Sequence, residues 1–246
     1  MRLVLLGSTG YHPSDQRHTA CLLLPEQGVM LDAGTGMYRA ARWLQTRELD
    51  IFLTHAHLDH VVGLTYLFSV TRQHPLDDIR VHALPEKIEA LKRHLLAEPL
   101  FPARLPCRFL PLAEHAPLPG QGQLTAFPVA HPGQALGFRL DWPGHSLAYV
   151  TDTTADPHAP YLAYLYGVDL LVHECCFRDA EAELARRTGH SHTTAVAQLA
   201  LAAHAGRLVL VHTDPTALED DPVDLPAAQA IFPNTQLGYD LMVLEF

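Results

Sequence analysis

Residues 50–60 read Asp-Ile-Phe-Leu-Thr-His-Ala-His-Leu-Asp-His, an apolar run followed at once by four side chains that can bind metal ions. The run at residues 51–53 has the β-branched and aromatic character of a buried strand. A strand that ends here and passes into a tight turn can direct all four polar side chains into one small volume. These candidate ligands are His55, His57, Asp59 and His60. Imidazole and carboxylate without thiolate are typical of a catalytic metal centre more than of a structural one.

Three more side chains of the same kinds follow apolar runs later in the chain. They are His131, Asp152 and His212, each at the carboxyl end of a strand-like segment and followed by turn residues. Taken alone in a chain with 17 histidines, any one of them would be an ordinary polar residue at a strand end. Four ligands are too few for two ions. Three more candidate ligands at successive strand ends indicate one shared site.

This ordered set resembles the metallo-β-lactamase superfamily, whose dinuclear members carry HxHxDH, then a single His, an Asp and a last His on successive strand ends. The resemblance runs from Gly7 to Phe246 and implies an α/β fold, an αββα sandwich of two mixed β-sheets flanked by helices. It also implies two divalent metal ions, with zinc expected and manganese or iron(II) as alternatives that suit the same ligands. By this resemblance His55, His57 and His131 hold one ion, Asp59, His60 and His212 hold the other, and Asp152 bridges them.

Composition bounds the class of protein and its partners. The chain has 246 residues and 48% hydrophobic content, enough to bury a large core in a single domain spanning residues 1–246. Seventeen Lys and Arg against 27 Asp and Glu give a net charge of −10 without a dense basic cluster, which disfavours a large nucleic acid as partner. The N-terminal apolar run is too short for a signal peptide, and no stretch approaches the ~20 apolar residues of a membrane span. We therefore expect a cytoplasmic protein that does not engage membranes.

Apolar periodicity and turn residues predict the elements along the chain. The predicted strands are residues 3–6, 19–24, 28–31, 50–54, 79–83, 124–129, 136–140, 146–150, 170–173, 208–211 and 241–246. The predicted helices pass through residues 40–44, 61–69, 86–97 and 193–205. Proline dominates residues 99–119, which we expect to form a surface loop that either shapes a substrate cleft or only connects elements.

Two further segments narrow the resemblance. Residues 173–177, His-Glu-Cys-Cys-Phe, and 189–195, Gly-His-Ser-His-Thr-Thr-Ala, look like the HEAT-type and HST-type segments of the ribonuclease Z branch and its phosphodiesterase relatives. In that branch the histidine faces the scissile phosphate and the glutamate orients it, which implies catalytic roles for His192 and Glu174. His190 is the competing choice, and the Thr-Thr-Ala after His192 favours His192. The alternative is that Glu174 and His192 make only local hydrogen bonds.

One departure from that branch bears on the substrate. Ribonuclease Z proper carries an inserted arm that grips tRNA, commonly between the third-motif His and the bridging Asp. Here His131 and Asp152 are only 21 residues apart, and a hairpin is predicted between them. The arm is missing from its usual place, which favours a smaller substrate. The resemblance is compatible with a homodimer, for which the sequence offers no argument of its own.

We therefore expect a metal-dependent hydrolase, a phosphodiesterase that attacks a small or nucleotide-type phosphodiester through a hydroxide bridging the two ions. Asp59 is the expected third catalytic residue, placed to orient or deprotonate that water. The alternatives are a lactonase, thioesterase or sulfatase with the same metal centre, or a ribonuclease Z that lacks the usual arm. The resemblance also implies that Asp32, an early Asp after a predicted strand, braces the metal loop by hydrogen bonds. Asp240 receives no role, because Leu241 departs from the family's closing Asp-Gly-Met.

Overall fold

The first β-sheet comes from the N-terminal half of the chain and its last strand. The computed structural model describes residues 1–217 and 219–246. The strands of this sheet are β1 (Arg2–Gly7), β2 (Cys21–Leu24), β3 (Val29–Leu31), β4 (Glu48–Phe52), β5 (Asp78–Ala83), β6 (Arg108–Pro111) and β14 (Val243–Glu245). They lie in the order β14-β1-β2-β3-β4-β5-β6, and β3 to β6 run parallel. Parallel strands leave all their carboxyl ends at one edge of the sheet.

The second β-sheet repeats this plan with the C-terminal half. Its strands are β7 (His115–Leu118), β8 (Gly122–Val129), β9 (Ala135–Trp142), β10 (His145–Val150), β11 (Leu170–Glu174), β12 (Leu208–Val211) and β13 (Thr235–Leu237). They lie in the order β13-β12-β11-β10-β9-β8-β7, with β10 to β13 parallel and β7 to β10 antiparallel. The predicted hairpin between His131 and Asp152 is confirmed as β9 and β10.

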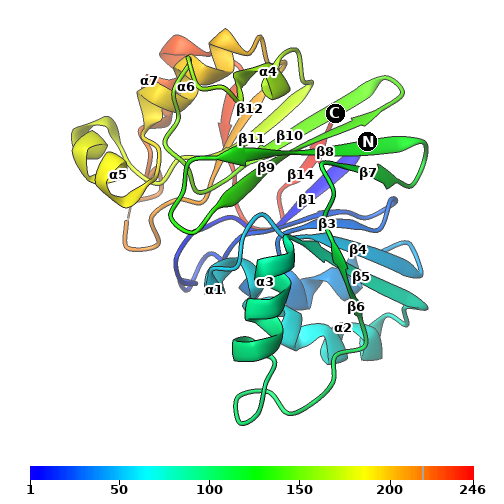
Figure 1. Cartoon of the computed structure of the whole chain (residues 1–246). Helices are drawn as coiled ribbons and strands as arrows, with labels where there is room; N and C mark the ends of the chain where they lie inside the picture. The colour runs from blue at the N-terminus through cyan, green and yellow to red at the C-terminus, as the bar shows by residue number, and fades with distance from the viewer. Residues whose placement is uncertain (218) are drawn as a thin grey trace.

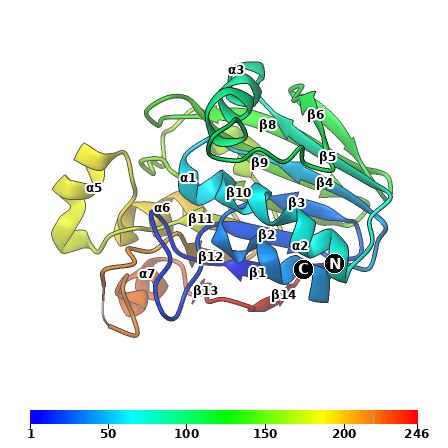
Figure 2. The same cartoon turned by 90° about the horizontal axis from the view of Figure 1, so that it is seen from below.

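Helices cover the outer face of each sheet (Figure 1). On the first sheet they are α1 (Leu58–Val61), α2 (Leu67–Gln73), α3 (Pro85–Ala90), the 3₁₀ turns η1 (Thr35–Arg42) and η2 (Val62–Tyr66), and the π-turn η3 (Leu91–Leu95). In the C-terminal half they are α4 (Leu162–Leu165), η4 (Asp179–Glu181), α5 (Ala182–Thr188), α6 (Thr193–Ala202) and α7 (Leu225–Ile231). Figure 2, seen from below, shows α1 and α2 in front of the first sheet. This arrangement confirms the predicted αββα sandwich of two mixed sheets.

Side-chain alternation along the strands builds the layers of the core. In β1, Leu3 and Leu5 pack between the two sheets, whereas Val4 and Leu6 pack under the helices of the first sheet. A strand that is covered on both faces reads as a continuous apolar run, which is why β1 was predictable. None of the helices in the described ranges is both long and apolar enough to cross a membrane.

The prediction for the proline-rich segment was wrong in part. Residues 99–119 contain β6 and β7 besides connecting turns. Pro111 lies in β6 and Pro117 in β7, and each of these strands is at the edge of its sheet. A proline removes one N–H from the ladder, which an edge strand tolerates because one side has no partner strand.

A partly buried ion pair joins β4 to β5 in the first sheet. Arg80 donates to the two carboxylate oxygens of Asp50 at 2.6 and 2.7 Å, and His82 contacts the same carboxylate at 2.8 Å. Burial disfavours the ionised form of Asp50, but the hydrogen bonds from Arg80 and His82 outweigh it and lower its pKa to about 2. The pair therefore contributes stability that depends on the ionised carboxylate.

We expect Asp50→Asn to lower the free energy of unfolding by about 2 kcal/mol at neutral pH, because an amide cannot accept the bidentate contact. An unfolded Asp has a pKa of about 3.9, so this stabilisation is complete above that value and is lost as the pH falls toward about 2. Urea unfolding at neutral pH and at a pH of about 2 measures this difference in the free energy of unfolding. Asp77→Asn, which breaks an exposed pair with Arg47, is the control and should change little. Equal losses in both variants would contradict the assignment.

Candidate metal centre

The candidate ligands gather where strands of the two sheets end at their carboxyl ends. His55 follows β4, His131 follows β8, Asp152 follows β10 and His212 follows β12. Small molecules and ions commonly bind to open α/β sheets at this edge, because the loops after parallel strands converge there. The sandwich therefore brings together residues from the whole length of the chain.

The backbone turns sharply at several of these strand ends. Asp32, Asp152 and His212 have φ angles of 58°, 49° and 55°, in the left-handed region. A residue with a Cβ atom pays about 1–2 kcal/mol for that conformation, so the surrounding structure must hold it in place. Such strain concentrates at functional sites, where it directs a side chain to one position.

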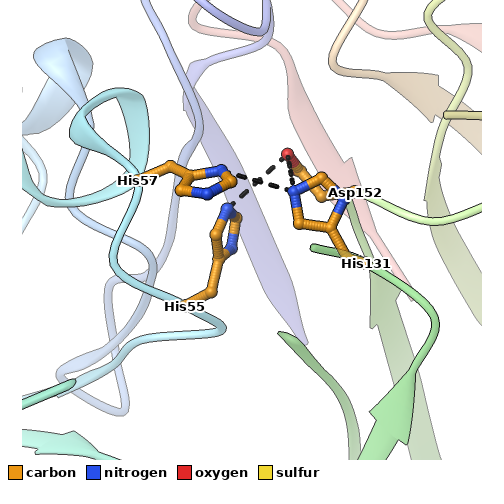
Figure 3. A group of neighbouring side chains, drawn as sticks. All are labelled: His55, His57, His131 and Asp152. Atoms are coloured by element: carbon orange, nitrogen blue, oxygen red, sulfur yellow. Dashed lines mark hydrogen bonds and ion pairs between the residues drawn. The ribbon is translucent and has the colours of Figure 1, made fainter. Parts of the chain in front are cut away.

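The first cluster consists of His55, His57, His131 and Asp152 (Figure 3). His131 Nε2 lies 3.3 Å from His57 Nδ1, and the Oδ2 atom of Asp152 lies 3.6 Å from His55 Nε2 and 3.7 Å from His131 Nε2. Figure 3 shows the three rings and the carboxylate pointing toward one common point from separate segments.

The second cluster lies on the other side of Asp152 and contains Asp59, His60 and His212. His60 Nε2 and His212 Nε2 are 3.2 Å apart, and each lies 3.4 Å from Asp59 Oδ2. The Oδ1 atom of Asp152 is 3.1 Å from His60 Nε2 and 3.2 Å from His212 Nε2. The structure thus brings all seven predicted ligands together in the two predicted sets, with Asp152 offering one oxygen to each.

These donor sets fit divalent metal ions. The Nε2 atom of His55 is buried and has no hydrogen-bond partner among the described residues. Ring nitrogens that face each other at 3.2 and 3.3 Å would repel if each carried a lone pair and nothing lay between them. Imidazole and carboxylate donors in such groups are ligands of zinc, manganese and iron(II).

The electrostatics of the clusters favour the metal-binding forms of His55, Asp59 and Asp152, whereas the surrounding carboxylates outweigh burial and raise the pKa of His60. Burial, with the neighbouring His60, holds the pKa of His55 well below its usual value, so its ring is neutral. Burial opposes ionisation of Asp59 and Asp152, but His60 and His212 outweigh it and hold the pKa of both carboxyls well below the usual range. Both carboxylates are therefore ionised at neutral pH.

Asp32 contacts the second cluster from behind, in the bracing role that the resemblance to the superfamily implied. Its Oδ2 atom contacts His60 Nδ1 at 2.8 Å, and its Oδ1 atom accepts the Thr54 N–H at 2.8 Å. A carboxylate on one ring nitrogen of a histidine fixes the ring and leaves the other nitrogen free for a metal. Asp32 lies behind the ligands and does not face the shared volume.

The predicted contact between Glu174 and His192 is absent, and His190 takes that place. Glu174 is fully buried at the end of β11, and its carboxylate contacts His190 Nδ1 at 3.0 Å. The same carboxylate accepts the backbone N–H groups of Thr153 and Ser191 at 2.8 and 3.1 Å. These contacts hold His190 beside the clusters, with its ring 5.5 Å from that of His212.

His192 points to a different partner. Its Nδ1 atom contacts Asp179 at 2.7 Å, and Asp179 also accepts the Thr194 N–H at 2.8 Å in the first turn of α6. His192 therefore belongs to the start of that helix. The Thr-Thr-Ala sequence after His192 belongs to the start of α6 and does not indicate which histidine contacts Glu174. The chain turns at Gly189, with φ 79°, and His190 is the histidine that makes this contact.

Burial lowers the pKa of His190, but the charge and hydrogen bond of Glu174 outweigh this and raise it to about 9. One donor atom of His190 lies within 4.8 Å of donor atoms of Asp152 and His212. The site therefore places an imidazole, paired with a buried carboxylate, next to both clusters.

Sequence reasoning missed the loop after β1, which closes over the second cluster. The backbone N–H of Tyr11 donates to Asp59 Oδ2 at 2.8 Å. A Cβ atom on Gly10 would lie 2.3 Å from the His212 ring, so only glycine allows this approach. The pair of glycines at residues 7 and 10 was the available signal.

Asp240 anchors that loop from the other end of the chain. Its carboxylate accepts the Ser8 N–H and O–H at 3.1 and 2.8 Å and the His18 N–H at 2.8 Å. Arg39 pairs with the same carboxylate at 2.5 Å. Asp240 thus holds the loop in place, a role that its altered sequence motif did not reveal.

Fold and site together define the class. The family profile described as "Beta-lactamase superfamily domain" matches residues 28–213, and the chain belongs to this superfamily. Ribonuclease Z of Prochlorococcus marinus is 43% identical over 109 residues, which cover 43% of this chain and 34% of that protein. That match thus spans about a third of the length of the relative. Ribonuclease Z of Bradyrhizobium diazoefficiens is 28% identical over an alignment that covers 97% of each chain.

Solved structures share the whole fold. The metallo-β-lactamase fold protein YhfI from Bacillus subtilis has a TM-score of 0.81, 18% identity and 99% coverage of both chains. Human tRNase Z, short form, has a TM-score of 0.78 and 22% identity, covering 100% of this chain and 99% of that chain. A diphosphatase from the PhnP family has a TM-score of 0.76 and 22% identity, covering 100% and 97%. The comparisons confirm the expected superfamily and its fold.

Metal binding is testable through stability. An ion that binds only the folded chain stabilises it by about 2.7 kcal/mol at a hundredfold excess over its Kd, so zinc should raise the Tm of the wild-type chain. Asp152→Ala removes the shared ligand and should lose most of that rise. His145→Ala, at the opposite end of β10, is the matched control and should keep it. A full zinc response in Asp152→Ala would overturn the ligand assignment.

Proposed function

We propose that this chain is a dinuclear metal-dependent phosphodiesterase that hydrolyses a small or nucleotide-type phosphodiester. Zinc is the proposed metal, with manganese and iron(II) as alternatives that suit the same donors. Two such ions would supply a water that ionises near neutral pH and positive charge beside the attacked phosphoryl oxygen. The remaining chemistry belongs to the side chains of this protein.

The observation that carries the proposal is the pair formed by His190 and the fully buried Glu174. Phosphodiesters differ from lactones and thioesters in carrying a negative charge before the reaction begins. A cationic imidazole held beside both clusters matches that charge. With Nδ1 occupied by Glu174, Nε2 of His190 is the atom available to donate to a phosphoryl oxygen or to the leaving alkoxide.

Asp59 serves the other side of the reaction. Its Oδ2 atom faces His60 and His212 and accepts the N–H of Tyr11. Because the carboxylate stays ionised, it can accept a hydrogen bond from a water in the centre and orient its lone pair toward phosphorus. Tyr11 and the two histidines limit the rotation of this carboxylate.

Two features of the chain bear on the size of the substrate, the hairpin between His131 and Asp152 and the net charge. Between His131 and Asp152 the chain forms only β9, β10 and their turns, so no arm extends from this interval. The net charge of −10 gives little attraction for a long polyanion. Both observations favour a small phosphodiester over a large nucleic acid.

The first test compares ester classes on one metal-quantified preparation. We expect turnover of bis(p-nitrophenyl) phosphate with about two ions per chain, and much lower kcat/KM for a lactone and for an aryl sulfate. Asp152→Ala should fall to background, and His145→Ala should match the wild type. Preference for the lactone or the sulfate would keep the metal centre and refute the assignment of phosphate.

The second test separates the two neighbouring histidines. His190→Ala should lower kcat for the phosphodiester by about 10²–10⁴-fold with unchanged metal content, because it removes the proton donor. His192→Ala removes a ring that faces Asp179 and should keep kcat close to that of the wild type. The opposite order of effects would restore the role to His192.

A second candidate is tRNA 3′ processing, favoured by the full-length similarity to ribonuclease Z of Bradyrhizobium diazoefficiens. A precursor tRNA with a 3′ trailer, assayed beside a dinucleotide, separates the two. If the substrate is a small phosphodiester, the dinucleotide should be cleaved and the precursor should remain intact. Site-specific cleavage of the precursor at a higher kcat/KM would establish the second candidate instead.

A further inference from the structure

Tyr149, a residue of the second sheet, contacts Asp32, the residue behind the second cluster. Tyr149 lies in β10 and is fully buried in the layer between the sheets. Its hydroxyl donates to Asp32 Oδ2 at 2.9 Å. Asp32 follows β3, so this hydrogen bond joins the two sheets directly behind the metal ligands.

The acceptor oxygen is the same one that holds His60. Asp32 Oδ2 contacts His60 Nδ1 at 2.8 Å and Thr54 Oγ1 at 2.9 Å, besides the phenol of Tyr149. The side chains of Asp32 and His60 are completely buried, so water cannot replace a missing donor from the surface. The angle at which His60 meets its carboxylate therefore depends on where Tyr149 holds that oxygen.

Asp32 also sets which nitrogen of His60 carries the proton. A carboxylate at hydrogen-bond distance from Nδ1 favours a proton on that nitrogen, and a metal ion in the second cluster would take the lone pair of Nε2. Since Asp32 is in the left-handed backbone region, with φ 58°, its side chain needs contacts that hold it against local strain. The phenol of Tyr149 supplies one such contact from a different sheet.

We propose that Tyr149 is a positioning residue, which fixes the His60 imidazole for a metal ion in the second cluster through Asp32. The inference rests on the proposed function only in requiring that the clusters bind metal. Tyr149 reaches the second cluster by a short route, through Asp32 to His60. A longer route leads through Asp32 and Thr54 to His55, whose Nδ1 lies 3.0 Å from Thr54 Oγ1. The two ions should therefore respond unequally.

The test is a zinc titration of Tyr149→Phe by competition with a chromophoric chelator. Loss of a hydrogen bond to a metal-binding residue typically lowers metal affinity by about 10–100-fold. We expect a loss of about tenfold for the ion in the second cluster. The other ion should keep the wild-type affinity within about twofold. Tyr161→Phe is the matched control, because Tyr161 is buried and its hydroxyl has no hydrogen-bond partner among the described residues. It should bind both ions like the wild type.

A second measurement excludes a merely structural effect. In ¹⁵N-histidine NMR spectra of the metal-loaded protein, the Nδ1–H signal of His60 should shift in Tyr149→Phe and stay unchanged in Tyr161→Phe. Wild-type affinities for both ions, or an equal loss at both with an unchanged His60 signal, would overturn the inference. Neither readout needs turnover, so an inactive protein that still binds two ions would refute the phosphodiesterase proposal and leave this one standing.

Discussion

The carboxylate of Asp152 lies between two groups of histidines and offers one oxygen to each. Its Oδ2 atom faces His55 and His131, and its Oδ1 atom faces His60 and His212. An ionised carboxylate in this position joins what would otherwise be two separate histidine clusters. The strand ends around it, and the left-handed turn at Asp152 itself, are the features that place those oxygens.

The sandwich serves this arrangement because each sheet contributes one part of the centre. The first sheet supplies the candidate ligands in the loop after β4 and in α1, and the second supplies His131, Asp152 and His212. The relative position of the two sheets therefore decides the distances in the centre. Packing of apolar side chains such as Leu5 and Phe138 holds the sheets together, and the bond from Tyr149 to Asp32 sets a polar contact within that layer.

Most of the strands and all seven candidate ligand positions were predictable from the sequence, whereas the division of these residues into two sets came from the resemblance to the superfamily. Buried parallel strands require continuous apolar runs, and a polar metal-binding residue that interrupts such a run marks a strand end. What sequence could not show was the direction of a side chain after a turn. His190 and His192 are two residues apart with the same chemistry, and only the turn at Gly189 and the position of Glu174 decide between them. The edge strands β6 and β7 were missed because their prolines read as loop. The anchoring role of Asp240 was missed because its partner Ser8 is distant in sequence.

The most direct test of the account is anomalous diffraction from crystals grown with zinc, recorded at the zinc absorption edge. We predict two peaks, one among His55, His57 and His131 and one among Asp59, His60 and His212, with the carboxylate of Asp152 between them. A single peak, or a peak bound by His190 in place of the second cluster, would contradict the shared-carboxylate centre.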